Sequence, residues 1–334
     1  MKKILIIQTA SLGDVILATP VLEKLHHYFP EATIDFLMKK GYESLFYRHP
    51  FLHQIITWDK SHKKYRHLNY LRKMVKVRKY DAVINLQRFA SSGYITAFSG
   101  ADHRIGFHKN PFSLFFTKRI RHRIGKSGKN PHETERNLRL ITHLTDNTPF
   151  KVKLYPSNHD YARVSQYKTR QFITIAPGSL WFTKQFPEEK WTEFIDRISE
   201  LHPSMYIYLL GASNEKKLCE RIIQRSKKQE NLLNLAGKFS LLESAALMRD
   251  AQMNYVNDSA PMHLASSVNA PTTAIYCSTV PEFGFGPLSK KSFIIQAKED
   301  IPCKPCGLHG FKKCPKKHFD CAYKISVEQL VKTI

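Results

Sequence analysis

Short apolar runs alternate with longer segments of helical periodicity along the first part of this chain. The predicted elements there are strands at 3–8, 33–38, 54–58 and 81–86 and helices at 14–28 and 65–79. Continuous apolar runs of this length are typical of strands buried on both faces, and the helices between them indicate parallel βαβ units. We therefore predict a doubly wound α/β domain in the first half.

The alternation weakens between residues 103 and 130, resumes with a predicted helix at 133–144, and gives way to a polar stretch at 145–168. It then restarts. The predicted elements of the second half are strands at 172–176, 205–210, 252–256 and 272–277 and helices at 188–201, 213–227, 241–249 and 261–268. These patterns predict two Rossmann-like domains, at 1–155 and 169–334, joined by a linker at 156–168. Ligands in such domains bind at the carboxyl ends of the strands, so we expect a ligand cleft there.

The length of 334 residues suits two domains of ordinary size. No apolar run approaches the roughly 18 residues of a membrane-spanning helix. The run after Lys2 and Lys3 stops at Gln8, short of the roughly 7–15 apolar residues of a secretory signal. We therefore expect a cytoplasmic protein.

The net charge of +24 is concentrated in two segments. Residues 60–79 hold nine Lys or Arg and residues 103–129 hold eight, and neither segment contains a carboxylate. Such segments attract nucleic acid, an anionic bilayer or a phosphorylated glycolipid, or they form a solvated basic surface. A nucleic-acid-binding protein is an alternative interpretation of this charge. No helix-turn-helix, zinc-finger or RNP motif supports it.

The loop after the first predicted strand carries the first candidate chemistry. It reads Ser11-Leu12-Gly13-Asp14 and contains neither the Gly-x-Gly-x-x-Gly of dinucleotide-binding folds nor a P-loop. Gly13 permits a tight turn or close ligand approach. Asp14 lies at a helix start, where a carboxylate either caps the helix or faces a ligand.

Two loops of the second half follow predicted strands in the same way. Ser179, Thr183 and Lys184 follow the strand at 172–176, and lysine is a flexible cation suited to phosphate. Asp258 and Ser259 follow the strand at 252–256. The backbone N–H groups of 259–262 are predicted to form an anion site at a helix start. His263 on that helix is either a packed residue or a ligand.

Four of the six cysteines are clustered near the end of the chain, at Cys303, Cys306, Cys314 and Cys321. Four thiolates at these spacings suit a tetrahedral zinc or iron site. Reduced thiols in a packed loop and a disulfide are the two other interpretations of the same cysteines.

Four motifs in register resemble the ADP-heptose lipopolysaccharide heptosyltransferases of glycosyltransferase family 9. They are Ser11-Leu-Gly-Asp14, Lys184-x-Phe-Pro-Glu-Glu-Lys-Trp, Asp258-Ser-x-x-x-His263-Leu-Ala, and the cysteine-rich tail with Cys314-Pro and His318. The resemblance spans nearly the whole chain. It implies a GT-B fold with the acceptor on the first domain and the nucleotide sugar on the second, and an inverting, metal-independent transfer of heptose from ADP-heptose.

The resemblance also implies roles for individual residues. Asp14 matches the general base that takes the proton of the acceptor hydroxyl. Residues implied to bind the donor are Gly13, Ser179, Thr183, Lys184, Glu215, Asp258, Ser259, Ala260 and His263. Residues implied to contact the acceptor are Ser11, Gln87, Arg88, His132 and Arg136. Glu215 is matched to a ribose-binding acid, although an acid in the first turn of a helix is equally consistent with its position.

The implied acceptor is the anionic inner core of lipid A, which places the enzyme on the cytoplasmic face of the inner membrane. No cofactor beyond the donor substrate is implied. Two departures from the family pattern leave another nucleotide sugar open as the donor. Ala260 stands where the family commonly has Gly, and Cys277-Ser278-Thr279 stands where Gly-Pro-Thr is often seen.

Overall fold

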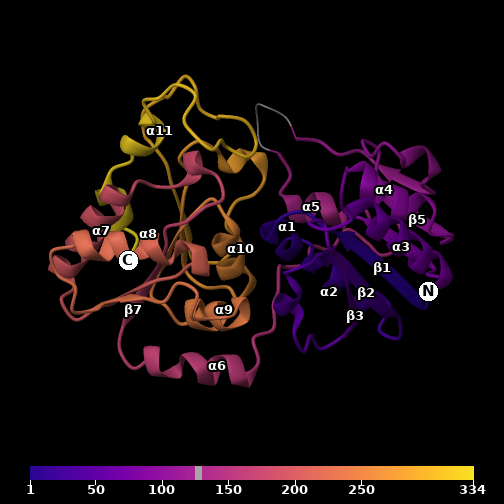
Figure 1. Cartoon of the computed structure of the whole chain (residues 1–334), viewed down its shortest axis with the longest axis horizontal. Coiled ribbons are helices and arrows are strands. Elements are labelled where there is room, and N and C mark those ends of the chain that lie inside the picture. The colour runs from indigo at the N-terminus through magenta and orange to yellow at the C-terminus, as the bar shows by residue number, and fades with distance from the viewer. Residues whose placement is uncertain (125–129) are drawn as a thin grey trace. The chain divides into compact units, whose positions relative to one another are not determined.

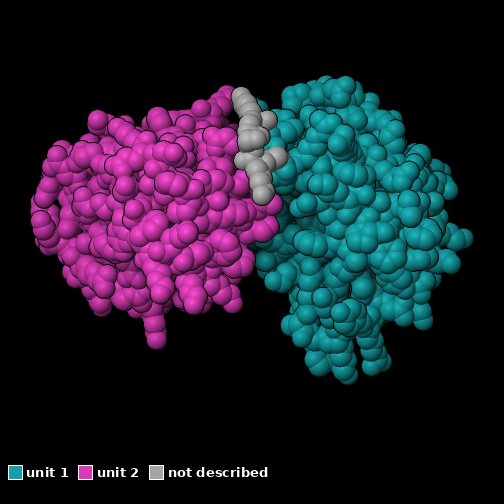
Figure 2. Space-filling model, turned by 90° about the horizontal axis from the view of Figure 1, so that it is seen from above, with its two compact units in different colours: residues 1–126, 130–155 teal, residues 127–129, 156–334 magenta. Residues whose placement is uncertain are grey.

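The computed structural model describes residues 1–124 and 130–334 of the chain. The described residues form two compact units, unit 1 within residues 1–155 and unit 2 within residues 156–334 (Figure 2). In this part of the chain each unit contains one six-stranded sheet. Lys126 and Lys129, which belong to the basic segment at 103–129, lie outside the described residues.

Unit 1 is a doubly wound α/β unit whose parallel strands follow the order β3-β2-β1-β4-β5-β6 (Figure 1). Its strands are β1 (Lys3–Gln8), β2 (Thr33–Lys39), β3 (Leu52–Trp58), β4 (Ala82–Asn85), β5 (His103–Phe107) and β6 (Lys118–Ile120). Its helices are α1 (Leu12–Ile16), α2 (Thr19–Tyr28), α3 (Lys64–Val77), α4 (Ala90–Ala97) and α5 (Glu133–Leu138), with 3-10 turns η1 (Glu43–Phe46) and η2 (Ser113–Phe115). Residues Ile4 to Ile7 of β1 are fully buried, as expected for a central parallel strand.

Unit 2 repeats this architecture with its own core. Its strands are β7 (Phe172–Ala176), β8 (Tyr206–Leu209), β9 (Leu232–Asn234), β10 (Asn254–Asn257), β11 (Thr272–Ile275) and β12 (Ser292–Ile295). Its helices are α6 (Asn158–Val164), α7 (Glu188–Leu201), α8 (Lys216–Arg225), α9 (Leu241–Arg249), α10 (Ala260–Ser267), α11 (Asp320–Tyr323) and α12 (Val327–Val331). The sheet order is β12-β11-β10-β7-β8-β9, which is the order of unit 1 once β7 is counted as the first strand.

The prediction of one helix at 14–28 is wrong. The segment forms α1 and α2, because Pro20 has no N–H to continue a helical ladder and is tolerated only in a first turn. Ser11 caps α1, and the hydroxyl of Thr19 donates to the carbonyl of Ile16 at 2.8 Å across the break. The predicted helix at 133–144 also ends early, at Leu138.

Several elements lie where the sequence pattern is weak. β5 and β6 fall within residues 103–130, and β6 is an edge strand whose residues are exposed or only partly buried, so it has no apolar run to reveal it. α6 lies inside the segment predicted as the linker and packs against α9. None of the helices among the described residues is long and apolar enough to cross a membrane.

Candidate active site

In both sheets the strand order reverses between two central strands, and ligands of doubly wound sheets bind at the carboxyl ends of such a pair. The pair is β1 and β4 in unit 1 and β7 and β10 in unit 2. Asp14 follows β1 and Arg88 follows β4, whereas Lys184 follows β7 and Asp258 follows β10. Most of the predicted site residues are therefore grouped at one edge of each sheet.

The Asp14 carboxylate caps its own helix with one of its two oxygens. Oδ2 accepts hydrogen bonds from the Ser11 backbone N–H at 3.0 Å and from the Ser11 hydroxyl at 2.6 Å, and Ser11 Oγ accepts from the Asp14 N–H at 3.3 Å. This is a capping box. Within residues 1–124 and 130–334, Oδ1 has no hydrogen-bond donor, and the side chain is only partly buried. Capping thus fixes the carboxylate and leaves one oxygen available.

Gln87 joins the two loops of unit 1. Its Oε1 accepts from the hydroxyl of Thr9, directly beyond β1, at 2.9 Å, and the Gln87 side chain is buried.

Lys60 contacts the same loop, because its Nζ donates to the carbonyl of Thr9 at 2.6 Å. Burial, followed by the charges of Lys39 and Lys64, lowers the pKa of Lys60 to about 8. Lys60 is thus a cation beside the Asp14 loop that the sequence did not single out.

Glu133 is a buried acid of the same group, and sequence reasoning missed it. Its Oε2 accepts from Arg136 Nε at 2.7 Å, and both side chains are almost fully buried. Burial raises the pKa of Glu133 to about 7; Arg136 opposes this rise, and the charge of Asp14 adds to it. The charges of Asp14, Arg136 and Arg88 thus all act on the Glu133 carboxyl. Glu133 carried no signal in the sequence beyond its place between His132 and Arg136.

His132 and Arg136 lie at the two ends of the first turn of α5. His132 is its N-cap, with Nδ1 accepting from the Thr134 N–H at 3.2 Å.

Burial lowers the pKa of His122 to about 3, and the charges of Arg88, Arg136 and Lys109 lower it further. The His122 ring is therefore a neutral group beside several cations.

In unit 2, Lys184 and Asp258 form a largely buried ion pair across the switch point. Lys184 Nζ lies 2.7 Å from Asp258 Oδ2, with the side chains 14% and 8% exposed. The same oxygen accepts from the hydroxyl of Thr279 at 2.6 Å. Thr279, in the loop after β11, was noted in the sequence only as part of Cys277-Ser278-Thr279, a stretch whose first two residues depart from a family pattern. The structure instead places it on the carboxylate that holds Lys184.

Thr183 connects the same loop to the cysteine-rich tail. Its hydroxyl accepts from the Phe311 N–H at 2.7 Å and from the Ser278 hydroxyl at 3.0 Å. Gly310 has a φ of +74°, and a Cβ there would lie 2.9 Å from Thr183 Oγ1. The tail therefore packs directly against the loop that carries Lys184, which the spacing of its cysteines did not reveal.

Glu215 lies against the backbone of two strand ends. A Cβ on Gly178 would lie 1.8 Å from Glu215 Oε1, and one on Gly211 would lie 2.8 Å from Oε2. Oε2 also accepts from the Ala212 N–H at 2.8 Å. Glycine at both positions is thus required for Glu215 to reach the carboxyl ends of β7 and β8. Ser179 shapes the same loop, accepting from the Trp181 N–H at 3.4 Å.

The anion site predicted at 259–262 is smaller than expected. The Met262 N–H donates to the Ser259 carbonyl at 3.1 Å, and Pro261 has no N–H. Ser259 and Ala260 therefore supply the backbone donors of this helix start. His263 is 5% exposed on the inner side of α10 and belongs to the packed part of the helix.

The six cysteines are free thiols, so the disulfide interpretation is wrong. Cys303 Sγ lies 3.7 Å from His318 Nε2, and Cys306 Sγ donates to the Cys303 carbonyl at 3.2 Å. Among the described residues no group of three or more His, Cys, Asp or Glu side chains is placed to hold a metal ion. The side chains as arranged do not fit the metal interpretation.

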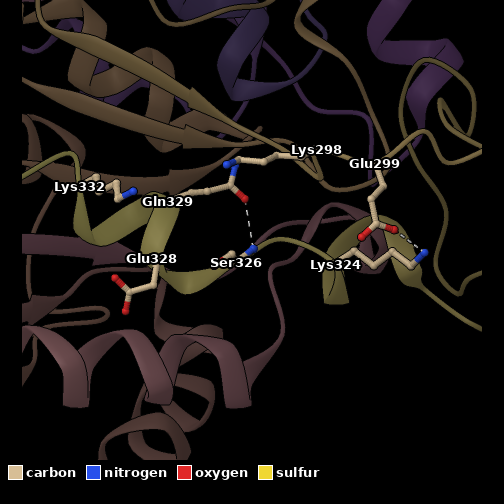
Figure 3. A pocket seen from close by; sticks show the side chains of 7 residues that line it. All are labelled: Lys298, Glu299, Lys324, Ser326, Glu328, Gln329 and Lys332. Carbon is tan, nitrogen blue, oxygen red and sulfur yellow. Dashed lines mark hydrogen bonds and ion pairs between the residues drawn. The ribbon is translucent and has the colours of Figure 1, made fainter.

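A hollow near the C-terminus lies apart from these loops (Figure 3). It is lined by Lys298, Glu299, Lys324, Ser326, Glu328, Gln329 and Lys332. Glu299 pairs with Lys324 at 2.7 Å, and Glu328 pairs with Arg197 at 3.3 Å. None of the predicted site residues lines this hollow, so we assign it no part in the site.

Two Rossmann-like units of this topology form the GT-B fold, which solved heptosyltransferase structures share. The model of glycosyltransferase family 9 (heptosyltransferase) matches residues 68–314. The chain belongs to this family, as the sequence motifs predicted.

Similar proteins include lipopolysaccharide heptosyltransferase 1 of Pseudomonas aeruginosa, which is 24% identical over 91% of this chain and 86% of its own length. The solved family 9 glycosyltransferase of Veillonella parvula superposes with a TM-score of 0.81 at 23% identity, covering 99% of this chain and 95% of that one. Escherichia coli heptosyltransferase WaaC, solved with ADP-2-deoxy-2-fluoro heptose, gives a TM-score of 0.68 at 19% identity and 99% coverage of both chains. These likenesses confirm the predicted fold class.

Proposed function

We propose that this protein transfers heptose from ADP-heptose to the inner core of lipopolysaccharide, with inversion at the anomeric carbon and without a metal. The observation that carries the proposal is the placement of the family motifs at the two switch points. A carboxylate with one available oxygen lies among cations in unit 1. A cation beside hydroxyls and a helix start lies in unit 2.

The donor site of the proposal is the switch point of unit 2. Lys184, with the hydroxyls of Ser179 and Thr183, binds the diphosphate, and the N–H groups of Ser259 and Ala260 add backbone donors. Asp258 holds Lys184 before the donor arrives and contacts the heptose hydroxyls, with His263 near the phosphates. Glu215 accepts from the ribose hydroxyls beside Gly178.

The acceptor site of the proposal is the switch point of unit 1. Arg88, Arg136 and His132 bind acidic groups of the acceptor, and Gln87 with Ser11 orients the sugar. Gly13 keeps the turn before Asp14 compact. The charge of this group favours an acceptor rich in phosphate and carboxylate. Such an acceptor is anchored in a bilayer, so the enzyme works at the cytoplasmic face of the inner membrane.

The reaction is a single displacement. The acceptor oxygen attacks the anomeric carbon of heptose, and the bond from that carbon to the β-phosphate oxygen breaks. Asp14 Oδ1 takes the proton of the attacking hydroxyl. The leaving ADP carries the bonding electron pair, and Lys184 stabilises the charge that develops on its phosphate. Attack from the face opposite the leaving group inverts the configuration.

The test is to incubate the protein with ADP-heptose and with defined truncated lipid A cores, and to measure the products by mass. We expect one heptose to be added to a core of defined length. A panel of other nucleotide hexoses is the control for the donor. Transfer of another sugar in preference to heptose would reject the proposed donor.

A further inference from the structure

Unit 1 exposes a contiguous cluster of large apolar side chains that the site does not use. Leu114 is 80% exposed, Phe115 is 54% exposed and Phe98 is 40% exposed. Phe98 lies 5.7 Å from Phe115 and 6.2 Å from Phe112 between ring centroids. We call Phe98, Phe112, Leu114 and Phe115 the aromatic patch. Single exposed apolar residues are common, but a contiguous group indicates a contact surface.

The patch is built by two neighbouring segments of the fold. Phe98 is the C-cap of α4, and Phe112 to Phe115 form and precede η2, which packs against α4 and β5. Tyr94 of α4 continues the ring contacts beneath, 5.2 Å from Phe98 and 5.9 Å from Phe112. These contacts fix the bases of the rings and leave the apolar surface of the patch facing solvent.

Basic side chains frame the patch. The Arg72 guanidinium lies 5.9 Å from the Tyr94 ring centroid, and Arg104 Nε donates to the Phe115 carbonyl at 2.9 Å. The exposed edge strand β6 brings Lys118 and Arg119 beside β5. Among the described residues 82–124 and 130–132 there are seven Lys or Arg and a single carboxylate, Asp102. The surroundings of the patch are therefore strongly cationic.

We infer that the aromatic patch and its basic frame bind an anionic lipid bilayer. Exposed aromatic and leucine side chains enter the headgroup boundary, and Lys and Arg around them attract anionic lipids. A second copy of this chain fits less well, because a two-fold interface would bring the same cationic frames together. The inference rests on the proposed function, in which the acceptor is anchored in a membrane. It adds that the aromatic patch is the surface of the protein that contacts this membrane.

Vesicle sedimentation tests the inference. We expect the protein to bind phosphatidylglycerol-containing vesicles and not phosphatidylcholine vesicles, with binding that weakens as salt is raised. Leu114→Ser with Phe115→Ser should lower the affinity for anionic vesicles roughly tenfold or more, because two large apolar groups are lost. Leu114→Ser alone, which removes few folded contacts, should give a smaller loss. Leu201→Ser is the matched control, since Leu201 is 46% exposed on unit 2.

Equal vesicle binding by the double variant and the wild type would overturn the inference, and so would equal binding of the wild type to neutral vesicles. Patch-dependent dimers seen by sedimentation without lipid would identify a second copy as the occupant instead. Transfer to a deacylated, soluble acceptor separates the two proposals. All patch variants should transfer heptose to the soluble acceptor at the wild-type rate. If the wild type itself does not transfer heptose to this acceptor, the proposed function is rejected, and the vesicle result still stands.

Discussion

At the scale of single residues, the proposed function gives the two oxygens of the Asp14 carboxylate different roles, since Oδ2 caps the helix and Oδ1 is proposed to take the acceptor proton. Asp14→Asn keeps an oxygen that can accept from Ser11 but cannot take up the acceptor proton. We expect it to fold, to bind ADP, and to lose transfer by about a hundredfold or more, the range expected for loss of a general base. Initial rates at saturating donor and acceptor measure the effect.

Unit 2 supplies a matched control for this variant. Asp160 forms the same capping box, with its Oδ2 accepting from the Ser157 N–H and from the Ser157 hydroxyl, each at 2.6 Å. Asp160→Asn also keeps an oxygen that can accept from Ser157, so it should cost less stability than loss of a whole cap, which is about 1 kcal/mol, while transfer stays near that of the wild type. Equal loss of transfer in both variants would mean that capping, and not proton transfer, explains Asp14.

Lys184 Nζ lies 2.7 Å from Asp258 Oδ2. In the proposed function, Lys184 exchanges this carboxylate for the diphosphate of the donor. Lys184→Ala should weaken ADP binding about ten- to a hundredfold, the value of one charge-assisted hydrogen bond. Acceptor binding should not change. Calorimetry with ADP measures the first quantity, and Lys190→Ala, which removes only a surface pair with Glu193 at 3.4 Å, is the control. Unchanged ADP affinity in Lys184→Ala would remove this lysine from the donor site.

His49 predicts a pH dependence of stability. Burial, followed by the charges of His26 and Lys153, lowers the pKa of His49 to about 4. Below about pH 6.5 the unfolded chain takes up a proton that the folded chain refuses, so stability is present above this pH and is lost as the pH falls. The loss approaches about 1.4 kcal/mol per pH unit down to about pH 4.

The variant His49→Phe tests this dependence, because His49 packs among the rings of Phe46, Phe51 and Tyr155. Urea unfolding between pH 4.5 and 7.5 should show the variant losing less stability on acidification than the wild type. Parallel pH profiles for the two proteins would contradict the assignment.

At the scale of secondary structure, the sequence predicted the elements that are long or fully buried. β1, β7, α7 and α9 were placed with the bounds that the structure has, because continuous apolar runs and uninterrupted helical periodicity are strong signals. β6 was missed since an exposed edge strand of three residues has no apolar run. The break between α1 and α2 was overlooked although Pro20 marks it.

The site followed a similar division. Motifs directly after strands predicted Asp14, Lys184 and Asp258 as site residues, because the carboxyl ends of parallel strands meet at one edge. Glu133 and Thr279 were not predicted as members, since their contacts depend on how distant loops fold together. Asp258 and Thr279 are 21 residues apart and share one hydrogen bond, and no local pattern encodes such a pair.

The loop after β7 depends on the closeness of Glu215 to Gly178. Gly178→Ala places a Cβ into the Glu215 carboxylate and should weaken ADP binding about tenfold or more, because Glu215 must leave its position. In the double variant Gly178→Ala with Glu215→Ala the clash is gone. Adding Gly178→Ala to Glu215→Ala should therefore weaken ADP binding much less than Gly178→Ala weakens it in the wild type. Gly286→Ala is the control, as no atom lies within 4 Å of a Cβ there. Additive losses would show that the two residues act independently.

At the scale of the whole molecule, one strand order carries two chemically different sets of loops. Unit 1 and unit 2 share the same sheet topology and both carry charged loops at the switch point. The loops differ in character, because unit 1 combines carboxylates with cations whereas unit 2 offers an ammonium, hydroxyls and a helix start. The net charge of +24 suits both an anionic donor and an anionic acceptor.

The central claim is inverting transfer of heptose from ADP-heptose to a lipopolysaccharide core. The most direct measurement is the anomeric configuration of the new glycosidic bond, determined by NMR on the product of wild-type protein, ADP-heptose and a heptose-deficient core. We predict a heptosylated core whose new linkage has the configuration opposite to that of the donor. A product with the donor's configuration, or no heptosylated core at all, would contradict this account.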